Sequence, residues 1–525
     1  MNEFVMNYQC MKTISMEPYS RDGRHPAVTC GLASLLLAFA CFFLPRVAAH
    51  AAERPNIILF LVDDMGWADS PVYGSTFYET PGMMRLAREG MKFTAAYAQP
   101  LCSPTRATLL TGKDAAARLQ MHQAITGQSA KNPRVPETAR PDRIACWPES
   151  RAQLPLEERT VAEALREGGY QTWHLGKWHL GNAQQFGPQK QGFEKVIGAG
   201  GAGPGGSYFA PYNVPLLPAG TNGEYVCERL TAEALKLLDE RDTAKPFFMY
   251  LAHFNVHSPY MAKPELVAHF KTKADPKNPQ RNPVMAAMIR SMDDSLSALL
   301  DKLDALNLAT NTVFLFLSDN GGVHWPNRAR GLEEMLPPTS NLPLRGGKCC
   351  FYEGGIRVPL LMRWPGRVKS GSTMDTPVHV ADFFPTALAL AGLKPEAGQV
   401  LDGENLVPLL TGASGLKRDT LFGHFPRATT LAQTMGGSWV REGDFKMIRL
   451  WFAGQNGADA YELYDLKADV GEEKNLAAAM AEKVTAMNRK LEAWLAQTGA
   501  LRPKRNPNWN GQMTVPKAGE NETAE

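Results

Sequence analysis

Two pairs of oxygen-bearing side chains follow apolar runs of the sequence. Asp63-Asp64 come directly after Ile57–Val62, and Asp319-Asn320 come shortly after Val313–Leu317. If both runs are parallel strands, their carboxyl ends meet at one edge of the sheet, where ligands gather in open α/β folds. Three carboxylates and one amide oxygen suit calcium or magnesium better than zinc. For either pair alone, however, the capping of a turn or of the next helix is the favoured interpretation.

A cysteine lies between these two pairs in the sequence, in the segment Cys102-Ser103-Pro104-Thr105-Arg106. With the residues up to Gly112, this segment predicts a helix that Pro104 opens and Gly112 ends. Cys102 would then lie at the helix N-terminus, where the dipole and free N–H groups favour an anion, and Arg106 could reach the same place. The alternative is a buried structural cysteine before an ordinary helix.

Elements that can position these residues alternate along the chain from Pro55 onward. Continuous apolar runs at Ile57–Val62, Phe247–Ala252 and Val313–Leu317 are typical of parallel strands with both faces covered. Longer segments of helical period separate them, and the clearest spans about Pro283 to Leu306. The sequence therefore predicts an α/β core, a mostly parallel sheet between helices.

Near residue 425 the pattern changes. Strand-like runs at Phe445–Leu450 and Tyr461–Leu466 precede a helix with an apolar inner face, which comprises Leu476, Val484, Met487, Leu491 and Trp494–Leu495. We predict a main domain over residues 53–425, a smaller α+β subdomain over 426–502 and a flexible tail over 503–525. Two loops are candidates for specificity, Gly198–Gly223 and Val323–Asn341.

The first 52 residues have the order of a secretory signal. Arg21 and Arg24 precede an apolar stretch from about Ala27 to Leu44, and small residues follow. We predict a signal peptide over residues 1–52 and export to the periplasm or the medium. Two alternatives stay open, an uncleaved membrane anchor and acylation of Cys41, and contact with a membrane is expected only if the segment is retained.

Composition excludes several other classes of protein. The 525 residues are 44% hydrophobic and 21% charged, as in a folded enzyme, and a net charge of +3 gives no reason to expect a nucleic-acid partner. Of eight cysteines, three lie in or before the apolar stretch. The remaining five show no disulfide or zinc spacing, and their odd number suggests that one thiol has another use.

Five sequence blocks together resemble the type I, formylglycine-dependent sulfatases, arylsulfatase-like members of the alkaline-phosphatase-like superfamily. The first block is Cys-x-Pro-x-Arg at residues 102–106 with Ala-Thr-Leu-Leu-Thr-Gly after it. The others follow the family's order over about Arg54 to Asn475, and they are Leu61–Gly66, His174–Gly181, Ser318–Gly321, and Gly347-Lys348 with Tyr352–Pro359. In this family a maturation enzyme oxidises the cysteine to formylglycine.

The resemblance implies a sulfuric ester hydrolase acting on a sulfated small molecule or glycan. It implies that one calcium ion is held by Asp63, Asp64, Asp319, Asn320 and the aldehyde made from Cys102, whose hydrate attacks sulfur. Positive charge for the sulfate oxygens would come from Arg106, Lys177 and Lys348. His179 would bond the hydrate and help it to expel sulfate, and His257 would lie at the leaving-group oxygen, with Lys348 sharing this role.

The histidine assignments differ in how far the sequence supports them. Lys177 and His179 lie two residues apart after a predicted strand, Gln171–Leu175, so both side chains could face one side. Because His253 is close to His257 in the sequence, a change of register would exchange the two. His257 is the favoured candidate.

Some residues depart from the family pattern, and two other functions stay open. Thr105 stands where serine is common, and Cys349-Cys350 follow Lys348 where small residues are usual. One alternative is a phosphomonoester or phosphonate hydrolase of the same superfamily, although Asn320 argues against a two-zinc site. The other is a sulfated-glycan-binding protein in which Cys102 stays a thiol.

Overall fold

The computed structural model describes residues 54–125, 141, 144–218, 220–413, 415–427, 429 and 434–511. The predicted signal peptide and residues 512–525 of the predicted tail lie outside the described residues. Within them, no helix is both long and apolar enough to cross a membrane.

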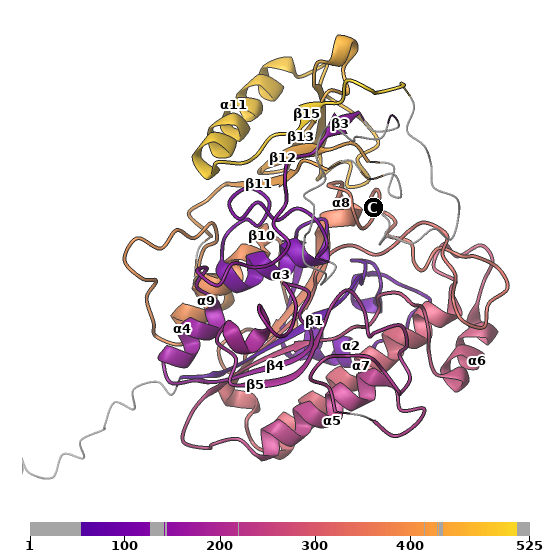
Figure 1. Cartoon of the computed structure of the whole chain (residues 1–525), viewed down its shortest axis with the longest axis vertical. Coiled ribbons are helices and arrows are strands. Elements are labelled where there is room, and N and C mark those ends of the chain that lie inside the picture. The colour runs from indigo at the N-terminus through magenta and orange to yellow at the C-terminus, as the bar shows by residue number, and fades with distance from the viewer. Residues whose placement is uncertain are drawn as a thin grey trace, which may run out of the picture. The chain divides into compact units, whose positions relative to one another are not determined.

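A nine-stranded sheet forms the centre of the molecule (Figure 1). Its strand order is β10-β2-β8-β7-β1-β6-β4-β5, with β9 paired to β2, and only β8 runs antiparallel to its neighbours. The strands are β1 (Asn56–Val62), β2 (Met91–Tyr97), β4 (Gln171–Lys177), β5 (Lys195–Gly200), β6 (Phe247–Ala252), β7 (Thr312–Ser318), β8 (Arg357–Arg363), β9 (Ser372–Met374) and β10 (Val378–His379). The predicted mostly parallel sheet is confirmed.

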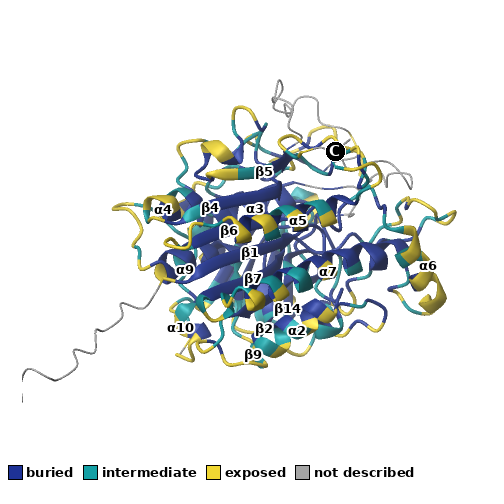
Figure 2. Ribbon diagram, turned by 90° about the horizontal axis from the view of Figure 1, so that it is seen from below, coloured by how far each residue is buried: buried dark blue, intermediate teal, exposed yellow. Residues whose placement is uncertain are grey.

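Helices cover both faces of this sheet. One face carries α3 (Cys102–Thr111), α4 (Val161–Glu167) and α9 (Phe383–Leu390), and the other carries α2 (Pro81–Glu89), α5 (Val226–Asp239) and α7 (Pro283–Ala305). Because side chains alternate along a strand, Ile57, Leu59 and Leu61 of β1 join one core, whereas Ile58, Phe60 and Val62 join the other. Figure 2 shows the central strands as buried. This three-layer arrangement explains why the strands are continuous apolar runs.

Shorter elements complete this part of the chain. They are α6 (Pro264–Lys273), α8 (Glu353–Ile356), α10 (Val407–Leu410) and 3₁₀ turns at Pro71–Tyr73, Pro188–Lys190, Ala309–Asn311 and Val380–Asp382. Helix α7 matches the predicted helix within one residue at its end, and Asn282 caps its start by accepting hydrogen bonds from the N–H groups of Val284 and Met285.

The C-terminal part forms a second, antiparallel sheet in the order β11-β12-β13-β14. Its elements are β11 (Thr420–Phe425), β12 (Gly437–Glu442), β13 (Phe445–Leu450), β14 (Ala460–Asp465), a 3₁₀ turn at Gln455–Gly457 and α11 (Ala481–Thr498). Met487, Leu491 and Leu495 of α11 pack on the sheet as predicted, whereas Leu476 precedes the helix and joins the same core from a loop. Beyond it, β15 (Lys504–Arg505) pairs with β3 (Ala145–Cys146). The predicted domain boundaries stay predictions.

A buried cluster of charges joins the second sheet to the central part. Lys446 of β13 donates from Nζ to carboxylate oxygens of both Glu353 and Glu472, each at 2.9 Å. Tyr97 donates to the second oxygen of Glu353 at 2.7 Å and also contacts Arg441. The ammonium group of Lys446 holds the pKa of Glu353 well below its usual range. Glu353 opens α8, so this cluster fixes the segment just after Lys348.

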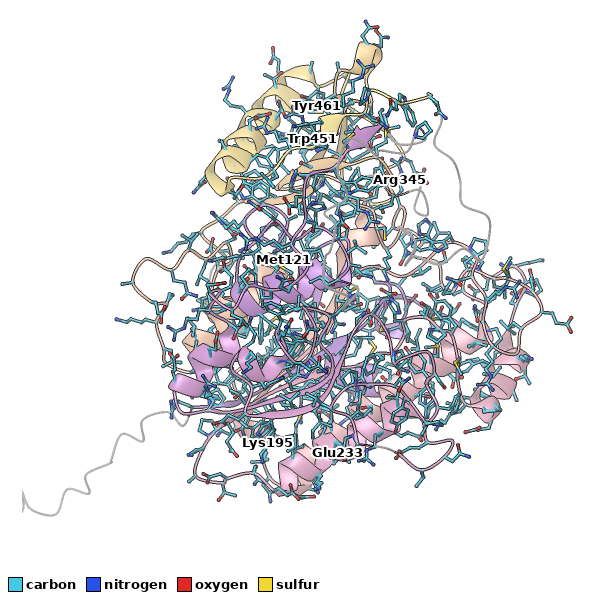
Figure 3. The ribbon with its side chains drawn as sticks, in the orientation of Figure 1. Met121, Lys195, Glu233, Arg345, Trp451 and Tyr461 are labelled. Atoms are coloured by element: carbon cyan, nitrogen blue, oxygen red, sulfur yellow. The ribbon has the colours of Figure 1, made fainter. Side chains whose placement is uncertain are left out.

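Arg345 makes a further connection in the same region. Its guanidinium Nη1 donates to the Tyr464 hydroxyl at 2.9 Å and to the carbonyl of Glu472 at 3.1 Å. In Figure 3, Arg345 lies between the central part of the molecule and Trp451 and Tyr461 of the C-terminal part. The segment that contains Lys348 is therefore anchored on both sides.

Replacing Lys446 with methionine should lower the free energy of unfolding by about 3–5 kcal/mol, because Glu353 and Glu472 would lose the cation that they share in a buried place. Denaturant titration measures this effect. Lys490→Met is the control, since Lys490 pairs with Glu442 at the surface and its loss should change stability little. A Lys446→Met protein as stable as the control would contradict the proposed anchoring.

Candidate active site

The two predicted pairs of oxygen ligands meet at the carboxyl edge of the central sheet. Strands β1 and β7 are parallel neighbours with Val62 opposite Ser318, so the residues after them are brought together. The N–H of Asp64 donates to Oδ1 of Asp319 at 3.2 Å, and Nδ2 of Asn320 donates to Oδ1 of Asp64 at 2.8 Å. All four side chains are buried. The two pairs therefore form one cluster and do not cap two separate turns, which is the alternative interpretation of the sequence.

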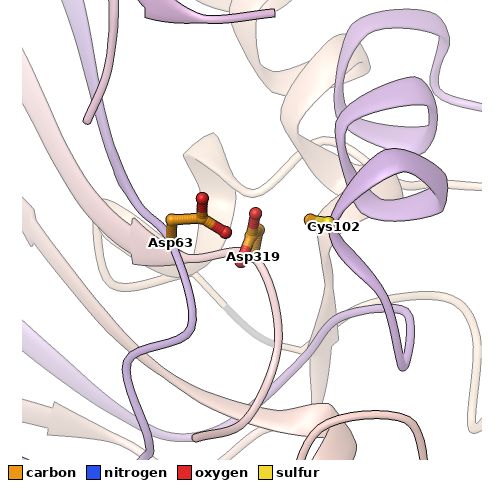
Figure 4. Close-up of side chains that lie close together, drawn as sticks. All are labelled: Asp63, Cys102 and Asp319. Carbon is orange, nitrogen blue, oxygen red and sulfur yellow. The ribbon is translucent and has the colours of Figure 1, made fainter. Parts of the chain in front are cut away.

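Cys102 faces the same cluster from the first turn of α3. Figure 4 shows Asp63, Asp319 and Cys102 converging, and one ligand atom of each lies within 4.8 Å of the others. Helix α3 begins at Cys102, two residues before Pro104, which corrects the predicted start. The physical reason is that proline is tolerated throughout the first helical turn, where its missing N–H has no intrahelical partner. The predicted end is confirmed, because Gly112 has a φ of 68°.

Three cations surround the carboxylates. Arg106 donates from Nε and Nη2 to Oδ2 of Asp319 at 3.0 and 2.8 Å. Lys177, the last residue of β4, lies 2.5 Å from Oδ2 of Asp63, and Lys348 lies 2.8 Å from Oδ2 of Asp64. The structure therefore brings all three predicted cations to the edge that holds the four oxygen ligands.

The charges of these groups show what the site can bind. Three carboxylates and three cations cancel, so a bound divalent cation would leave the site with two net positive charges, which attract an anionic substrate. Oδ1 of Asp63 and Oδ1 of Asn320 are buried and, among the described residues, accept no hydrogen bond. Burial and the neighbouring Asp63 carboxylate raise the pKa of Asp319. Buried oxygen atoms that accept no hydrogen bond are suited to binding a hard cation such as calcium.

Two histidines lie at the site and a third does not. Nδ1 of His179 is 3.2 Å from Sγ of Cys102, and burial together with Lys177 lowers the pKa of His179, so its ring is neutral. Nε2 of His257 lies 3.7 Å from Oδ2 of Asp64, and Nδ1 of His257 donates to the carbonyl of Ser258. His253 instead contacts Ser295 and Cys227 inside the core. The geometry thus places His257, and not His253, at the site.

The state of Cys102 limits its chemistry. Burial raises the pKa of its thiol to about 11. At neutral pH the side chain is therefore a protonated thiol, which is a weak nucleophile.

The five cysteines of the described residues are buried and form no disulfide among themselves. Cys350, one of the residues that depart from the family pattern, has a structural role. Its Sγ donates to the carbonyl of Gly347 at 2.9 Å and accepts from the N–H of Gly347 at 3.3 Å. Cys350 therefore stabilises the turn that contains Lys348.

The sequence did not predict two residues that hydrogen-bond to the backbone of the site histidines, Tyr208 and Ser103. The hydroxyl of Tyr208 lies 2.5 Å from the carbonyl oxygen of Phe254 and 2.7 Å from that of His257. Ser103 donates to the carbonyl of His179 at 2.9 Å. Tyr208 belongs to the predicted specificity loop Gly198–Gly223, so that loop reaches the site through the backbone of His257. No local pattern marks Tyr208 or Ser103, because their partners are distant in sequence.

This fold and site define an alkaline-phosphatase-like hydrolase of anionic esters. The family model described as Sulfatase matches residues 55–393, and that described as N-sulphoglucosamine sulphohydrolase, C-terminal, matches residues 347–499. The chain belongs to the sulfatase family and is a sulfuric ester hydrolase. This family uses a formylglycine and a divalent metal ion, and two groups of side chains here, Asp63–Cys102–Asp319 and Asp63–Asp64–His257, are candidates to hold an ion.

Similar proteins cover nearly the whole chain. N-acetylgalactosamine-6-sulfatase of Homo sapiens is 33% identical over 84% of this chain and 85% of its own length. A sulfatase of Formosa agariphila is 30% identical over 89% and 94%. The crystal structure of Ps i-CgsB is 28% identical with a TM-score of 0.69, covering 88% of this chain and 95% of that one, and it has also been solved with k-i-k-neocarrahexaose.

Proposed function

We propose that the chain hydrolyses sulfate esters of carbohydrates, with a nucleophile made by oxidation of Cys102 to formylglycine and with one bound calcium ion. The observation that carries the proposal is the convergence of Cys102 with Asp63 and Asp319 among three buried cations. A formylglycine-generating enzyme is the partner that this nucleophile requires.

The ligands of the calcium ion would be Asp63, Asp64, Asp319, Asn320 and the modified side chain at position 102. The buried Oδ1 atoms of Asp63 and Asn320 support this assignment, since they have no hydrogen-bond partner in the described part of the chain. When bound, calcium supplies positive charge for the sulfate oxygens, and the formylglycine hydrate supplies an attacking hydroxyl.

Arg106, Lys177 and Lys348 would stabilise negative charge during the reaction. Each is buried and already contacts a carboxylate of the site, so its position is fixed before substrate binds. Charge on the sulfate oxygens grows as the ester bond breaks, and fixed cations lower the barrier more than mobile ones. Burial strengthens this effect because little water screens the charges.

Proton transfer would fall to the two histidines and Lys348. Nδ1 of the neutral His179 lies 3.2 Å from the side chain of residue 102 and can accept a proton from it, which helps to release sulfate. Nε2 of His257 lies 3.7 Å from Oδ2 of Asp64, and 8% of the residue's surface is exposed. That place suits an acid for the leaving-group oxygen, a role that Lys348 can share.

A carbohydrate is the substrate class that the surroundings favour. An open cavity of about 870 Å³ is lined by His324, Pro337, Thr339 and Asn341 of the second predicted specificity loop and by Gly346, which precedes Lys348 by two residues. A cavity of this size accommodates an oligosaccharide. Names of the relatives support the same class, since one is a sulfatase of N-acetylgalactosamine and one solved structure holds a neocarrahexaose. The order of residues 1–52 supports export to the periplasm or the medium.

The ratio of activity on sulfate and phosphate esters of one phenol tests this proposal. With Asn320 in place of a ligand for a second metal, the site lacks the second cation that two-metal phosphatases use. We therefore expect kcat/KM to be at least about 100-fold higher for the sulfate ester, equivalent to about 2.7 kcal/mol. Faster turnover of the phosphate ester would support the phosphohydrolase alternative instead.

A further inference from the structure

Asn341 lies where three glycine-containing turns meet. Its Oδ1 accepts a hydrogen bond from the N–H of Gly322 at 3.1 Å. Its Nδ2 donates to the carbonyl of Gly322 at 2.9 Å and to that of Gly346 at 3.0 Å. The side chain is buried, with 2% exposed. One amide group thus satisfies three backbone groups of two separate turns.

The third turn, which contains Gly66, packs directly against the same amide. A Cβ atom on Gly66 would lie 2.5 Å from Oδ1 of Asn341, and one on Gly347 would lie 2.7 Å from Nδ2. Neither distance is possible for a real side chain, so these two positions need glycine for the amide to remain in place. The amide therefore fills the space between all three turns.

Each of these turns adjoins residues of the proposed site. One residue separates Gly66 from Asp63-Asp64, one residue separates Gly322 from Asp319-Asn320, and Gly346-Gly347 directly precede Lys348. The carbonyl of Gly322 accepts not only from Asn341 but also from the N–H of Lys348 at 3.2 Å. The amide and the Lys348 backbone thus share one acceptor.

Asn341 itself is held from outside the site. Two residues before it, the hydroxyl of Thr339 donates to Oδ1 of Asp69 at 2.5 Å, and Oδ2 of Asp69 accepts from the N–H of Gly66 at 2.8 Å. The N–H of Thr339 donates to the carbonyl of Val323. A second set of contacts therefore joins two of these turns, those of Gly66 and of Gly322-Val323, to the segment that contains Asn341.

We propose that Asn341 is a positioning residue that sets the separation between Lys348 and the carboxylates proposed to bind calcium. Asparagine suits this place because a single planar group must accept from one turn and donate to two carbonyls. Without it, the turn before Lys348 and the turn after Asn320 would lose their side-chain link. Asn341 touches neither the proposed ion nor the reacting atoms. The inference rests on the proposed function for the roles of Lys348 and the metal ligands.

Two variants of Asn341 and one control test the inference. Asn341→Ala removes all three hydrogen bonds, whereas Asn341→Asp keeps the volume and the acceptor but turns the donor into an oxygen that faces two carbonyls. Asn56→Ala is the matched control. Asn56 is also a buried asparagine that links two segments, through Phe247 and Thr312, but it lies at the opposite end of β1.

The readouts are calcium affinity, measured by calorimetric titration of chelator-treated protein, and kcat/KM on phenyl sulfates with good and poor leaving groups. We expect Asn341→Ala to weaken calcium binding and to lower kcat/KM by about 10- to 100-fold. This is the usual effect of losing a residue that orients metal ligands without binding the metal itself. We expect a larger loss on the poor leaving group for both Asn341 variants, because displaced Lys348 assists it less. Asn56→Ala should stay within about threefold of the parent in every readout.

The results distinguish failure of this inference from failure of the proposed function. If both Asn341 variants match Asn56→Ala in calcium affinity and in leaving-group dependence, the positioning role is wrong while the sulfatase proposal stands. If the parent protein turns over no sulfate ester, the proposed function fails, and calcium affinity alone decides the role of Asn341. Should Asn341→Ala not fold, Asn341→Asp provides the same comparison at unchanged volume.

Discussion

Cys102→Ala should lower kcat/KM on a sulfate ester by about five orders of magnitude or more, since loss of an enzyme's covalent nucleophile typically costs about 10⁶-fold. Alanine offers no group to oxidise and no oxygen to attack sulfur. The rest of the site would remain, because within the described residues the thiol forms one hydrogen bond, with Nδ1 of His179. The residual rate would come from binding and from the cations. A steady-state assay with a chromogenic sulfate ester measures the effect.

Cys227→Ala is the matched control for this prediction. Cys227 is also buried and its Sγ lies 3.7 Å from a histidine nitrogen, that of His253, but it is inside the core between α5 and α7. We expect full activity after a small loss of stability, and melting temperatures of both variants should show that both are folded. Activity of Cys102→Ala above about 1% of the parent would contradict a covalent role for position 102.

Removal of calcium should abolish turnover reversibly. The ion is expected to contribute several kcal/mol to the stabilisation of the charge that develops on sulfate, so chelation should lower kcat by about 1,000-fold or more. The protein should stay folded without the ion, because the three carboxylates already contact Arg106, Lys177 and Lys348. At a free calcium concentration 100 times its Kd, binding should add about 2.7 kcal/mol to the free energy of unfolding.

Activity and thermal unfolding before chelation, after chelation and after return of calcium measure this prediction. Asp319→Asn should lose the calcium response, since it removes one of the proposed ligands. Asp293→Asn is the control, because Asp293 is a buried carboxylate that accepts hydrogen bonds from the N–H groups of Gly82 and Met83, on α7 and away from the site. Full activity in the presence of a strong chelator would rule out a role for the ion.

Periodicity predicted the fold wherever local pattern and burial agree. Strands β6 and β13 begin and end at the predicted residues, and α7 differs by one residue at its end. In each of these elements most of the buried positions carry apolar residues, so the pattern of apolar residues in the sequence follows the burial. Strand β14 is shifted by one residue from its predicted range. The start of α3 was missed because proline marks the first turn of a helix but not its first residue.

Motifs predicted the candidate site because its residues stand in short blocks beside strand ends. The structure brings all of them together, and the catalytic and metal-binding roles assigned to them stay predictions. Asn341, Tyr208 and the turn made by Cys350 lay beyond such reasoning. Their partners are backbone groups of distant loops, and such contacts depend on how loops fold over one another and not on any local spacing of residues. Cys349-Cys350 departed from the family pattern without a reason visible in the sequence.

The mass of the peptide that contains Cys102 tests the central claim most directly. The protein should be produced in a host with a formylglycine-generating enzyme, digested and compared with Cys102→Ala. We predict a peptide lighter than the cysteine form by about 18 Da, since a carbonyl oxygen replaces the sulfur and two hydrogens are lost. An unmodified thiol in protein that has met competent maturation machinery would contradict the mechanism, and would favour a sulfated-glycan-binding protein in its place.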